Sequence, residues 1–287
     1  MPRVGLEPTR IAPADFKSCS TAELLNNFIK SRREGLSPQT IKNYQLYLRL
    51  ANSVVGINVK GQEIQQFLAS RTCTNGGKHA YYRCLRAFYN WLYSPKSGLG
   101  LEIQNNPILL VEPPKVERKI LPSLTLQQLD YLISQAETTR DKAIISLFAD
   151  SGLRLMELAS INTHNIDWEH RLIKAKCKGN KEGFAPFGSR TESLLREWLN
   201  QYHDNGRLWD ISHHAITWML RKLKDKTGLP CNAHTFRRTF ASILAKRGID
   251  SLHIMRLGRW ESIQMVERYT RSVKFDDSLK LYRSLET

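Results

Sequence analysis

The 287-residue sequence contains no uninterrupted run of about 18 apolar residues, which argues against a transmembrane helix. It also lacks any Cys-x-x-Cys pair, although it has five cysteines, Cys19, Cys73, Cys84, Cys177 and Cys231. Cysteines scattered in this way disfavour a disulfide framework or a zinc finger and indicate a reducing compartment. We therefore expect a cytoplasmic protein that does not span a membrane.

Acidic residues are scarce, with 27 Asp and Glu against 43 Lys and Arg, so the formal net charge is +16. Residues 1–112 carry 14 basic and 7 acidic side chains, and residues 113–287 carry 29 and 20. Because both halves are basic, we expect two surfaces that hold one polyanion. Nucleic acid is the first candidate for that partner and an anionic membrane surface the second. Solvated surface charge without a partner is the alternative explanation.

The first half of the chain is expected to be helical. Residues 1–16 show no apolar periodicity and are interpreted as a flexible arm, and residues 17–112 as an all-helical domain. Its four helices are expected to begin at the capping box 20–23, at Ser37-Pro38, near Gln62, and after Gly76-Gly77. The helical spacing of apolar residues in the second helix continues to Val55.

Proline and charge mark a boundary in the middle of the chain. The stretch 113–123 begins with Pro113-Pro114 and is interpreted as an extended linker. Residues 124–287 then form a second domain, with helices from Thr125 onward and a β-hairpin within 165–187. A final helix is expected over 273–285. The fold class is mainly α with a small β-hairpin or sheet.

Four places in the second half carry residues suited to phosphate chemistry. They are Arg154 with Glu157 at a helix start, Lys178 at the hairpin tip, His234 with Arg237 on one helical face, and Trp260 with Tyr269 near the end. Each has an ordinary explanation when taken alone. An arginine or a turn lysine is commonly at the surface, a histidine near a helix start commonly caps or packs, and Trp and Tyr are commonly core residues.

Taken together, this order and spacing resembles the tyrosine recombinase family of phage integrases and Xer-like proteins. The resemblance covers nearly the whole chain, with 32 residues from Arg237 to Tyr269 and 9 from Trp260 to Tyr269. It implies a helical core-binding domain followed by a mixed α/β catalytic domain. Many family members have histidine where this chain has Trp260. Arg259 is one position too early to align with that histidine.

The resemblance implies a role for each of these residues. Tyr269 would attack a DNA phosphodiester and form a 3′-phosphotyrosyl link, and His234 would act as a general base or orienting group. Arg154 and Arg237 would hold the two non-bridging oxygens, a task that suits guanidinium groups.

Three further residues would support this reaction. Lys178 would protonate the departing 5′ oxygen. Trp260 can only donate a hydrogen bond, so it would bind the phosphate without moving a proton. Glu157 would orient the residues that touch the phosphate.

The expected partners are double-stranded DNA and further copies of the chain, as a tetramer on DNA, and no membrane partner is expected. No metal is expected, because the cluster lacks several carboxylates, and no nucleotide or other cofactor is expected, because no phosphate-binding Gly-x-x-x-x-Gly-Lys loop is present. The helix over 273–285 either closes its own core or is donated to a neighbouring protomer. It contains Tyr282, which is outside the spacing expected of the nucleophile.

The sequence is compatible with several functions. A site-specific recombinase that integrates or excises a mobile element leads, and Xer-like resolution of chromosome or plasmid dimers is an alternative. A topoisomerase-IB-like nicking-closing enzyme and a noncatalytic DNA-binding regulator are others. The codons of residues 5–8, Gly-Leu-Glu-Pro, can spell the complement of a conserved tRNA-gene arm. Residues 1–12 are therefore interpreted as a translated attachment site.

Overall fold

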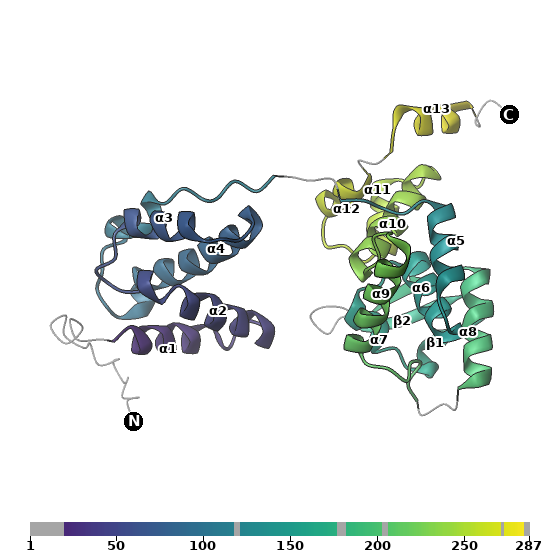
Figure 1. Cartoon of the computed structure of the whole chain (residues 1–287), viewed down its shortest axis with the longest axis horizontal. Helices are drawn as coiled ribbons and strands as arrows, with labels where there is room; N and C mark the ends of the chain where they lie inside the picture. Colours follow the sequence, from purple (N-terminus) through teal and green to yellow (C-terminus); the bar gives the residue numbers. More distant parts are fainter. Residues whose placement is uncertain (1–19, 118–120, 177–181, 203–205, 271–272, 284–287) are drawn as a thin grey trace, which may run out of the picture. The chain divides into compact units, whose positions relative to one another are not determined.

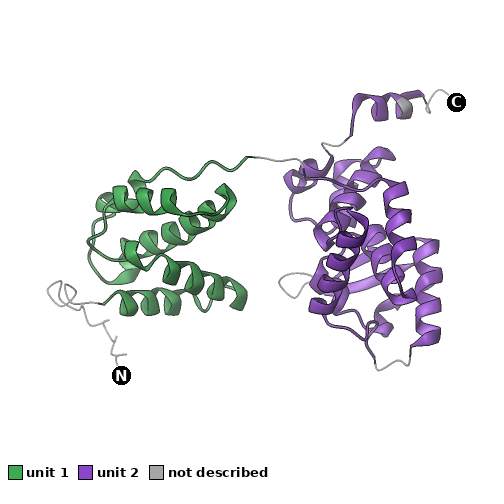
Figure 2. Ribbon diagram, viewed as in Figure 1, with its two compact units in different colours: residues 1–118 green, residues 119–287 purple. Residues whose placement is uncertain are grey.

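A computed structural model describes residues 20–117, 121–176, 182–202, 206–270 and 273–283. The chain divides into two compact units, Met1–Arg118 and Lys119–Thr287 (Figure 2). The division falls inside the proline-containing stretch 113–123. The arm 1–16 and Lys178 lie outside the described residues.

Unit 1 is built from helices (Figure 1). The α-helices are α1 (Thr21–Arg32), α2 (Pro38–Leu50), α3 (Gly61–Ser70) and α4 (Asn75–Leu92). Short 3-10 turns lie at η2 (Asn52–Val54), η3 (Pro95–Ser97), η4 (Ile103–Asn105) and η5 (Pro107–Leu110). The capping box is present, because the Ser20 hydroxyl accepts from the Glu23 amide and the Glu23 carboxylate accepts from the Ser20 amide.

Two helix limits in unit 1 differ from those expected. α4 begins before the paired glycines, because the Thr74 hydroxyl accepts from the Gly77 amide and caps the helix there. α2 ends at Leu50, so Val55 lies beyond the helix in extended backbone. Val55 is buried all the same, since it follows a 3-10 turn that returns it to the core. Spacing alone did not reveal that turn.

Aromatic side chains fill the core of unit 1. Phe28 of α1 meets Phe88 of α4 edge to face, with 5.6 Å between ring centroids. The buried Tyr89 hydroxyl donates to the Val54 carbonyl over 2.8 Å. This bond ties η2 to α4 and satisfies a polar group inside the core.

Unit 2 combines helices with one small sheet (Figure 1). Its helices are α5 (Leu126–Gln135), α6 (Thr139–Ser151), α7 (Leu155–Ala159), η6 (Thr163–Asn165), α8 (Ser189–Gln201), α9 (His213–Thr227), α10 (Ala233–Lys246), α11 (Ser251–Leu257), α12 (Ile263–Thr270) and α13 (Phe275–Arg283). Its strands are β1 (Ile166–Asp167), β2 (Leu172–Lys176) and β3 (Glu182–Pro186). The order is β1-β2-β3, both pairs are antiparallel, and Ile173 lies opposite Ala185. The expected fold class is confirmed, and β1 adds a strand to the expected hairpin.

The core of unit 2 is centred on α6, whose side chains are buried over most of its length. Phe148 of α6 stacks against Phe236 of α10 with centroids 5.8 Å apart. A smaller apolar cluster joins α10, α11 and α12 through Phe240, Ile254 and Val266. This second cluster matters for function, because it holds together the helices that carry His234, Arg237 and Tyr269.

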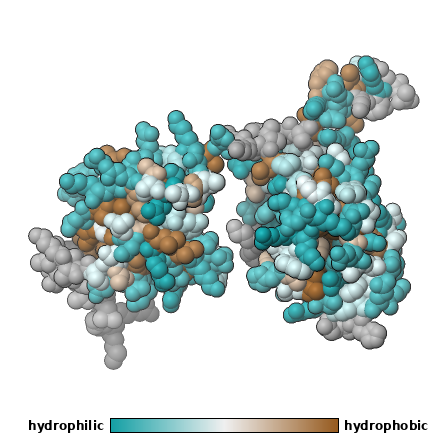
Figure 3. Space-filling view, viewed as in Figure 1, coloured by the Kyte–Doolittle hydropathy of each residue, from teal (hydrophilic) through white to brown (hydrophobic). Residues whose placement is uncertain are grey.

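Hydrophilic residues cover most of unit 2 on the face drawn in Figure 3, whereas hydrophobic side chains show on α13. Phe275 and Tyr282 of α13 are exposed, and Leu281 lies against the loop at Gly248. No helix within the described ranges is both long and apolar enough to cross a membrane.

Candidate active site

Arg154 and Glu157 form a pair at the start of α7. Gly152 ends α6 in the left-handed conformation, with φ of 57°, and Arg154 is the N-cap residue of α7. The Glu157 carboxylate accepts from the Arg154 guanidinium over 2.6 Å and from the Arg154 amide over 2.9 Å. Only 4% of the Glu157 side chain is exposed, whereas the Arg154 side chain is partly exposed. Glu157 therefore holds one nitrogen of the Arg154 guanidinium, and the rest of that guanidinium is partly accessible to solvent.

Arg237 lies on the buried face of α10. Its guanidinium donates to the carbonyls of Gly152 and Gly258, the latter over 2.6 Å, so it joins the end of α6 to the end of α11. Burial lowers the pKa of Arg237 to about 10, and the cations of Arg154 and Arg259 act in the same direction. A group with this pKa stays protonated at neutral pH. The site therefore contains a buried, fixed positive charge.

Trp260 connects Arg237 to Tyr269. The Arg237 guanidinium lies 4.2 Å from the centroid of the Trp260 ring, and the centroid of the Tyr269 ring lies 5.6 Å from that of Trp260. Trp260 is 5% exposed, and within the described part of the chain its indole N–H has no hydrogen-bond acceptor. A buried donor of this kind is costly unless a ligand supplies the acceptor.

His234 stands on the first turn of α10, one turn before Arg237. Partial burial lowers its pKa, and the nearby cations of Arg238, Arg237 and Arg154 lower it further. The imidazole is therefore neutral at neutral pH and can accept a proton. His234 is nevertheless exposed to solvent as a residue.

Two arginines in the site were not assigned a role from the sequence. The side chain of Arg259 is 8% exposed and forms an ion pair with Glu157, with 3.7 Å between Nη2 and Oε2. Arg238 is buried next to Arg237 and donates to the carbonyl of Pro122 over 3.1 Å. The spacing of Arg238 from His234 by four residues could have indicated a shared helical face. No local pattern could have indicated the contacts of Arg259, since its partners are distant in the chain.

Unit 2 thus brings together six of the residues predicted from the sequence, namely Arg154, Glu157, His234, Arg237, Trp260 and Tyr269. Among these residues and Arg259, one carboxylate faces three guanidinium groups. Such an excess of partly buried positive charge is stabilised by an anion with several acceptor oxygens. A phosphate diester has this chemistry.

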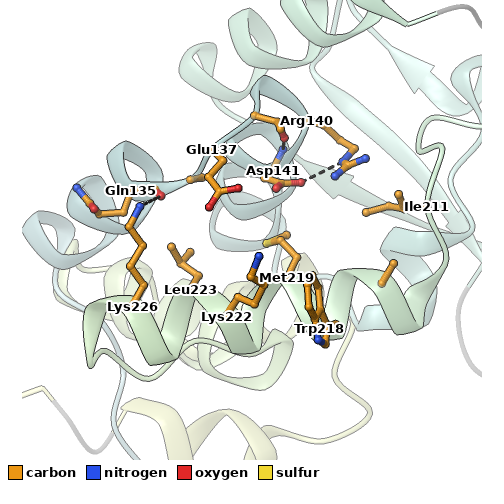
Figure 4. A pocket seen from close by; sticks show the side chains of 13 residues that line it. Gln135, Glu137, Arg140, Asp141, Ile211, Trp218, Met219, Lys222, Leu223 and Lys226 are labelled. Atoms are coloured by element: carbon orange, nitrogen blue, oxygen red, sulfur yellow. Dashed lines mark hydrogen bonds and ion pairs between the residues drawn. The ribbon is translucent and has the colours of Figure 1, made fainter.

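A separate cavity of about 330 Å³ opens between α9 and the turn from α5 to α6 (Figure 4). Trp218, Lys222 and Met219 line one side of it, and Lys226 donates to the Gln135 carbonyl over 3.0 Å. It is lined by none of the site residues named above. No group of three or more His, Cys, Asp or Glu in the described ranges could hold a metal ion.

Comparison with known sequences identifies relatives across most of the chain. The Phage integrase family model matches residues 122–274, more than half of the sequence. Tyrosine recombinase XerA of Saccharolobus solfataricus is 28% identical over 219 residues, covering 76% of this chain and 69% of the relative. Tyrosine recombinase XerC of Shewanella sp. (strain W3-18-1) is 27% identical over 279 residues, covering 90% of this chain and 91% of the relative.

Solved structures share the fold. The XerH site-specific recombinase, crystallised on palindromic difH substrate as a post-cleavage complex, has a TM-score of 0.71 at 19% identity and covers 94% of this chain and 85% of its own. A lambda integrase (75–356) dimer bound to a COC' core site has the same TM-score at 13% identity, covering 87% and 94%. Tyrosine recombinases transfer DNA strands, so the predicted enzyme class is confirmed. The chain is a member of the phage integrase family of tyrosine recombinases.

Proposed function

We propose that this protein is a site-specific recombinase that cuts and rejoins double-stranded DNA through a 3′-phosphotyrosyl intermediate at Tyr269. The observation that carries this proposal is the contact series Arg237–Trp260–Tyr269 beside the Arg154–Glu157 pair. It joins the Tyr269 phenol through Trp260 to the Arg237 guanidinium, and Arg154 is close enough to Arg237 to lower its pKa. Attack by the phenol oxygen forms the tyrosyl–phosphate bond and breaks the bond to the 5′ oxygen, so the phosphodiester energy is kept for religation.

The two arginines hold the scissile phosphate in this proposal. Arg237 is fixed by two carbonyls and cannot rotate away, which preorganises its charge for the transition state. Arg154 is more exposed and held at one end by Glu157, so its free edge can meet the second non-bridging oxygen. The indole N–H of Trp260 can donate to the same phosphate.

Proton transfer completes the reaction. Tyr269 must lose a proton to attack, and we assign its acceptance, or the orientation of the phenol, to His234, whose lowered pKa favours the neutral imidazole. The departing 5′ oxygen must gain a proton, which we assign to Lys178. Lys178 lies outside the described residues, and its role rests on the family pattern.

Exposed cations on both units support binding to duplex DNA. α9 exposes Arg221, Lys222, Lys224 and Lys226 against the single acidic Asp225. In unit 1, α2 exposes Lys42 and Arg49, and α4 exposes Arg83 and Arg86. Several such contacts with phosphates make DNA affinity fall steeply as salt rises.

The test begins with a pool of nicked duplexes with a randomised core, in which cleavage releases a short strand and traps the covalent adduct. Wild-type protein is expected to form adducts that survive denaturation, and sequencing of the captured DNA gives the preferred site. Tyr269→Phe should form none. Tyr282→Phe is the matched control, because Tyr282 is 62% exposed on α13, and it should retain wild-type yield. An adduct that persists in Tyr269→Phe, or none with wild type across the pool, refutes the proposal.

Exchange between two copies of the selected site separates a recombinase from a nicking-closing enzyme. A recombinase should give exchanged products from two-site DNA, whereas a topoisomerase-like enzyme should relax one supercoiled plasmid without them. We further propose that exchange occurs in a tetramer, for which the exposed Phe275 on α13 is a candidate contact. Crosslinking on two-site DNA, with and without residues 273–287, tests that assembly.

We propose integration or excision of a mobile element as the biological role, with a tRNA gene as the target. The codon argument on residues 1–12 is its support, and these residues lie outside the described ranges. The gene's own nucleotide sequence decides this point. A match between that region and the 3′ part of a tRNA gene supports it, and absence of any match overturns it. Resolution of chromosome or plasmid dimers would then be the preferred role.

A further inference from the structure

Arg259 occupies a junction between four chain segments of unit 2. Its Nη1 donates to the carbonyl of Leu257 over 2.9 Å and of Phe184 over 3.1 Å, and its Nη2 donates to the carbonyl of Ser151 over 3.1 Å. These carbonyls belong to the end of α11, to β3 and to the end of α6. The fourth partner is the Glu157 carboxylate on α7. One buried cation therefore ties together the segments that surround the proposed phosphate site.

The backbone of Arg259 is also unusual. Its φ of 56° lies in the left-handed region, which residues other than glycine seldom adopt. This turn reverses the chain immediately before Trp260, whose amide donates back to the Met255 carbonyl over 3.0 Å. The Trp260 ring consequently packs directly over Gly258. The conformation is retained because the guanidinium contacts of Arg259 hold it.

We propose that Arg259 is a positioning residue for strand cleavage. It orients Arg154 through Glu157, and its own left-handed backbone conformation fixes the position of the Trp260 ring. This inference rests on the proposed function, because Arg154 and Trp260 are the groups assigned there to the scissile phosphate. Arg259 itself points to backbone carbonyls and does not need to touch DNA.

The physical reason is the sharing of one carboxylate between two cations. Glu157 Oε1 binds Arg154 and Glu157 Oε2 faces Arg259, so the negative charge of this carboxylate is divided between the two guanidinium groups. If Arg259 becomes neutral, Glu157 attracts Arg154 more strongly. The free edge of Arg154 is then drawn away from the phosphate, and charge stabilisation in the transition state declines.

Arg259→Gln tests this, because glutamine is neutral and of comparable length and still donates to a carbonyl. Covalent adduct formation is measured in single turnover on the selected site, once with the ordinary phosphate and once with a methylphosphonate at the scissile position. The methyl group replaces one non-bridging oxygen and removes its charge, so less help from Arg154 is needed. We expect Arg259→Gln to slow cleavage of the phosphate by about 100-fold, as a small misplacement of a reacting group can. The methylphosphonate should be slowed much less.

Three control variants make the result specific. Arg154→Ala should show the same pattern, Arg259→Lys should recover most of the rate, and Arg256→Gln, an exposed position on the same turn, should behave as wild type. The rate ratio between the two substrates within one preparation does not depend on the fraction of folded protein, so a partly unfolded variant still gives an answer.

Equal slowing of both substrates by Arg259→Gln would overturn the inference and leave Arg259 as a purely structural residue. Failure of Arg259→Lys to recover cleavage would overturn it as well. If Arg154→Ala shows no relief on the methylphosphonate, the failure lies in the proposed role of Arg154. That outcome also overturns the inference. It is distinguishable from the others because the unexpected result then appears in Arg154→Ala and not in the Arg259 variants.

Discussion

Replacing Gly258 by alanine would place one methyl group against the six-membered ring of Trp260. A Cβ built on Gly258 lies 1.8 Å from Cζ3 of Trp260 and 2.3 Å from Cε3, far closer than atoms can approach. The backbone of Gly258, with φ of −87° and ψ of 0°, suits alanine without strain. The perturbation is therefore steric, and its target is the ring that contacts both Arg237 and Tyr269.

The magnitude follows from what Trp260 can do in response. Expelling the indole would expose roughly 200 Å² of apolar surface, a cost of about 5 kcal/mol, so the ring is expected to shift within its pocket. Overpacking of this kind costs about 1–3 kcal/mol. Alanine recovers up to about 1 kcal/mol of backbone preference over glycine, which is too little to reverse the sign. We expect a net loss of about 1–2 kcal/mol in the free energy of unfolding.

Cleavage should respond more strongly than stability. A shift of about 1 Å in Trp260 moves it against Arg237 and Tyr269, and such a displacement can cost about 100-fold in rate. DNA affinity should change little, because it rests on exposed cations elsewhere. Urea unfolding, single-turnover adduct formation and DNA binding at fixed salt measure the three quantities separately.

Two comparisons sharpen this prediction. Gly35→Ala is the matched control, since nothing lies within 4 Å of its built Cβ, and it should leave all three quantities unchanged. In the double variant Gly258→Ala with Trp260→Ala, the clash disappears, so the two changes should be strongly non-additive. Wild-type cleavage and wild-type stability of Gly258→Ala would refute the packing of Trp260 described above.

Three further predictions concern other parts of unit 2. Arg237→Lys should lower the cleavage rate by about 100- to 1000-fold in adduct assays with DNA affinity retained, because an ammonium lacks the planar fork with which a guanidinium can hold a phosphate while it bonds two carbonyls. A rate near wild type would contradict its assignment. The lowered pKa of His234 means that below its ordinary value of 6.5 the unfolded chain takes up a proton that the folded protein resists. Stability should therefore decline as the pH falls from 6.5 towards the lower pKa of the folded state, and His234 should add no pH dependence above 6.5. His234→Gln should remove this part of the pH dependence in urea titrations. Thr239→Val should cost about 1–3 kcal/mol in unfolding free energy, because the buried Leu124 amide loses its acceptor at 2.9 Å, whereas the exposed Thr217→Val should cost little. Equal unfolding midpoints for these two threonine variants would contradict the burial of that amide.

Much of the local structure followed from the sequence alone. Helix starts at Ser20, Ser37 and Thr125 were predictable, because a capping side chain bonds to an amide only three residues away. The i, i+3 spacing likewise placed His234 with Arg237 on one face of α10, and Arg154 with Glu157 at the start of α7. The helical composition and the hairpin gave the fold class for the same reason, since these patterns are written in neighbouring residues.

The arrangement of the site was decided by the tertiary structure. Arg237 is held by carbonyls 85 and 21 residues away in the chain, and Arg259 contacts Ser151 across 108 residues. No local pattern encodes such pairings, because they depend on how α6, α10, α11 and β3 pack around a shared core. The sequence by itself determined which chemical groups this protein has. Only the packing of distant segments decided that a buried arginine outside the family pattern would join them, because burial and partner choice are properties of the whole fold.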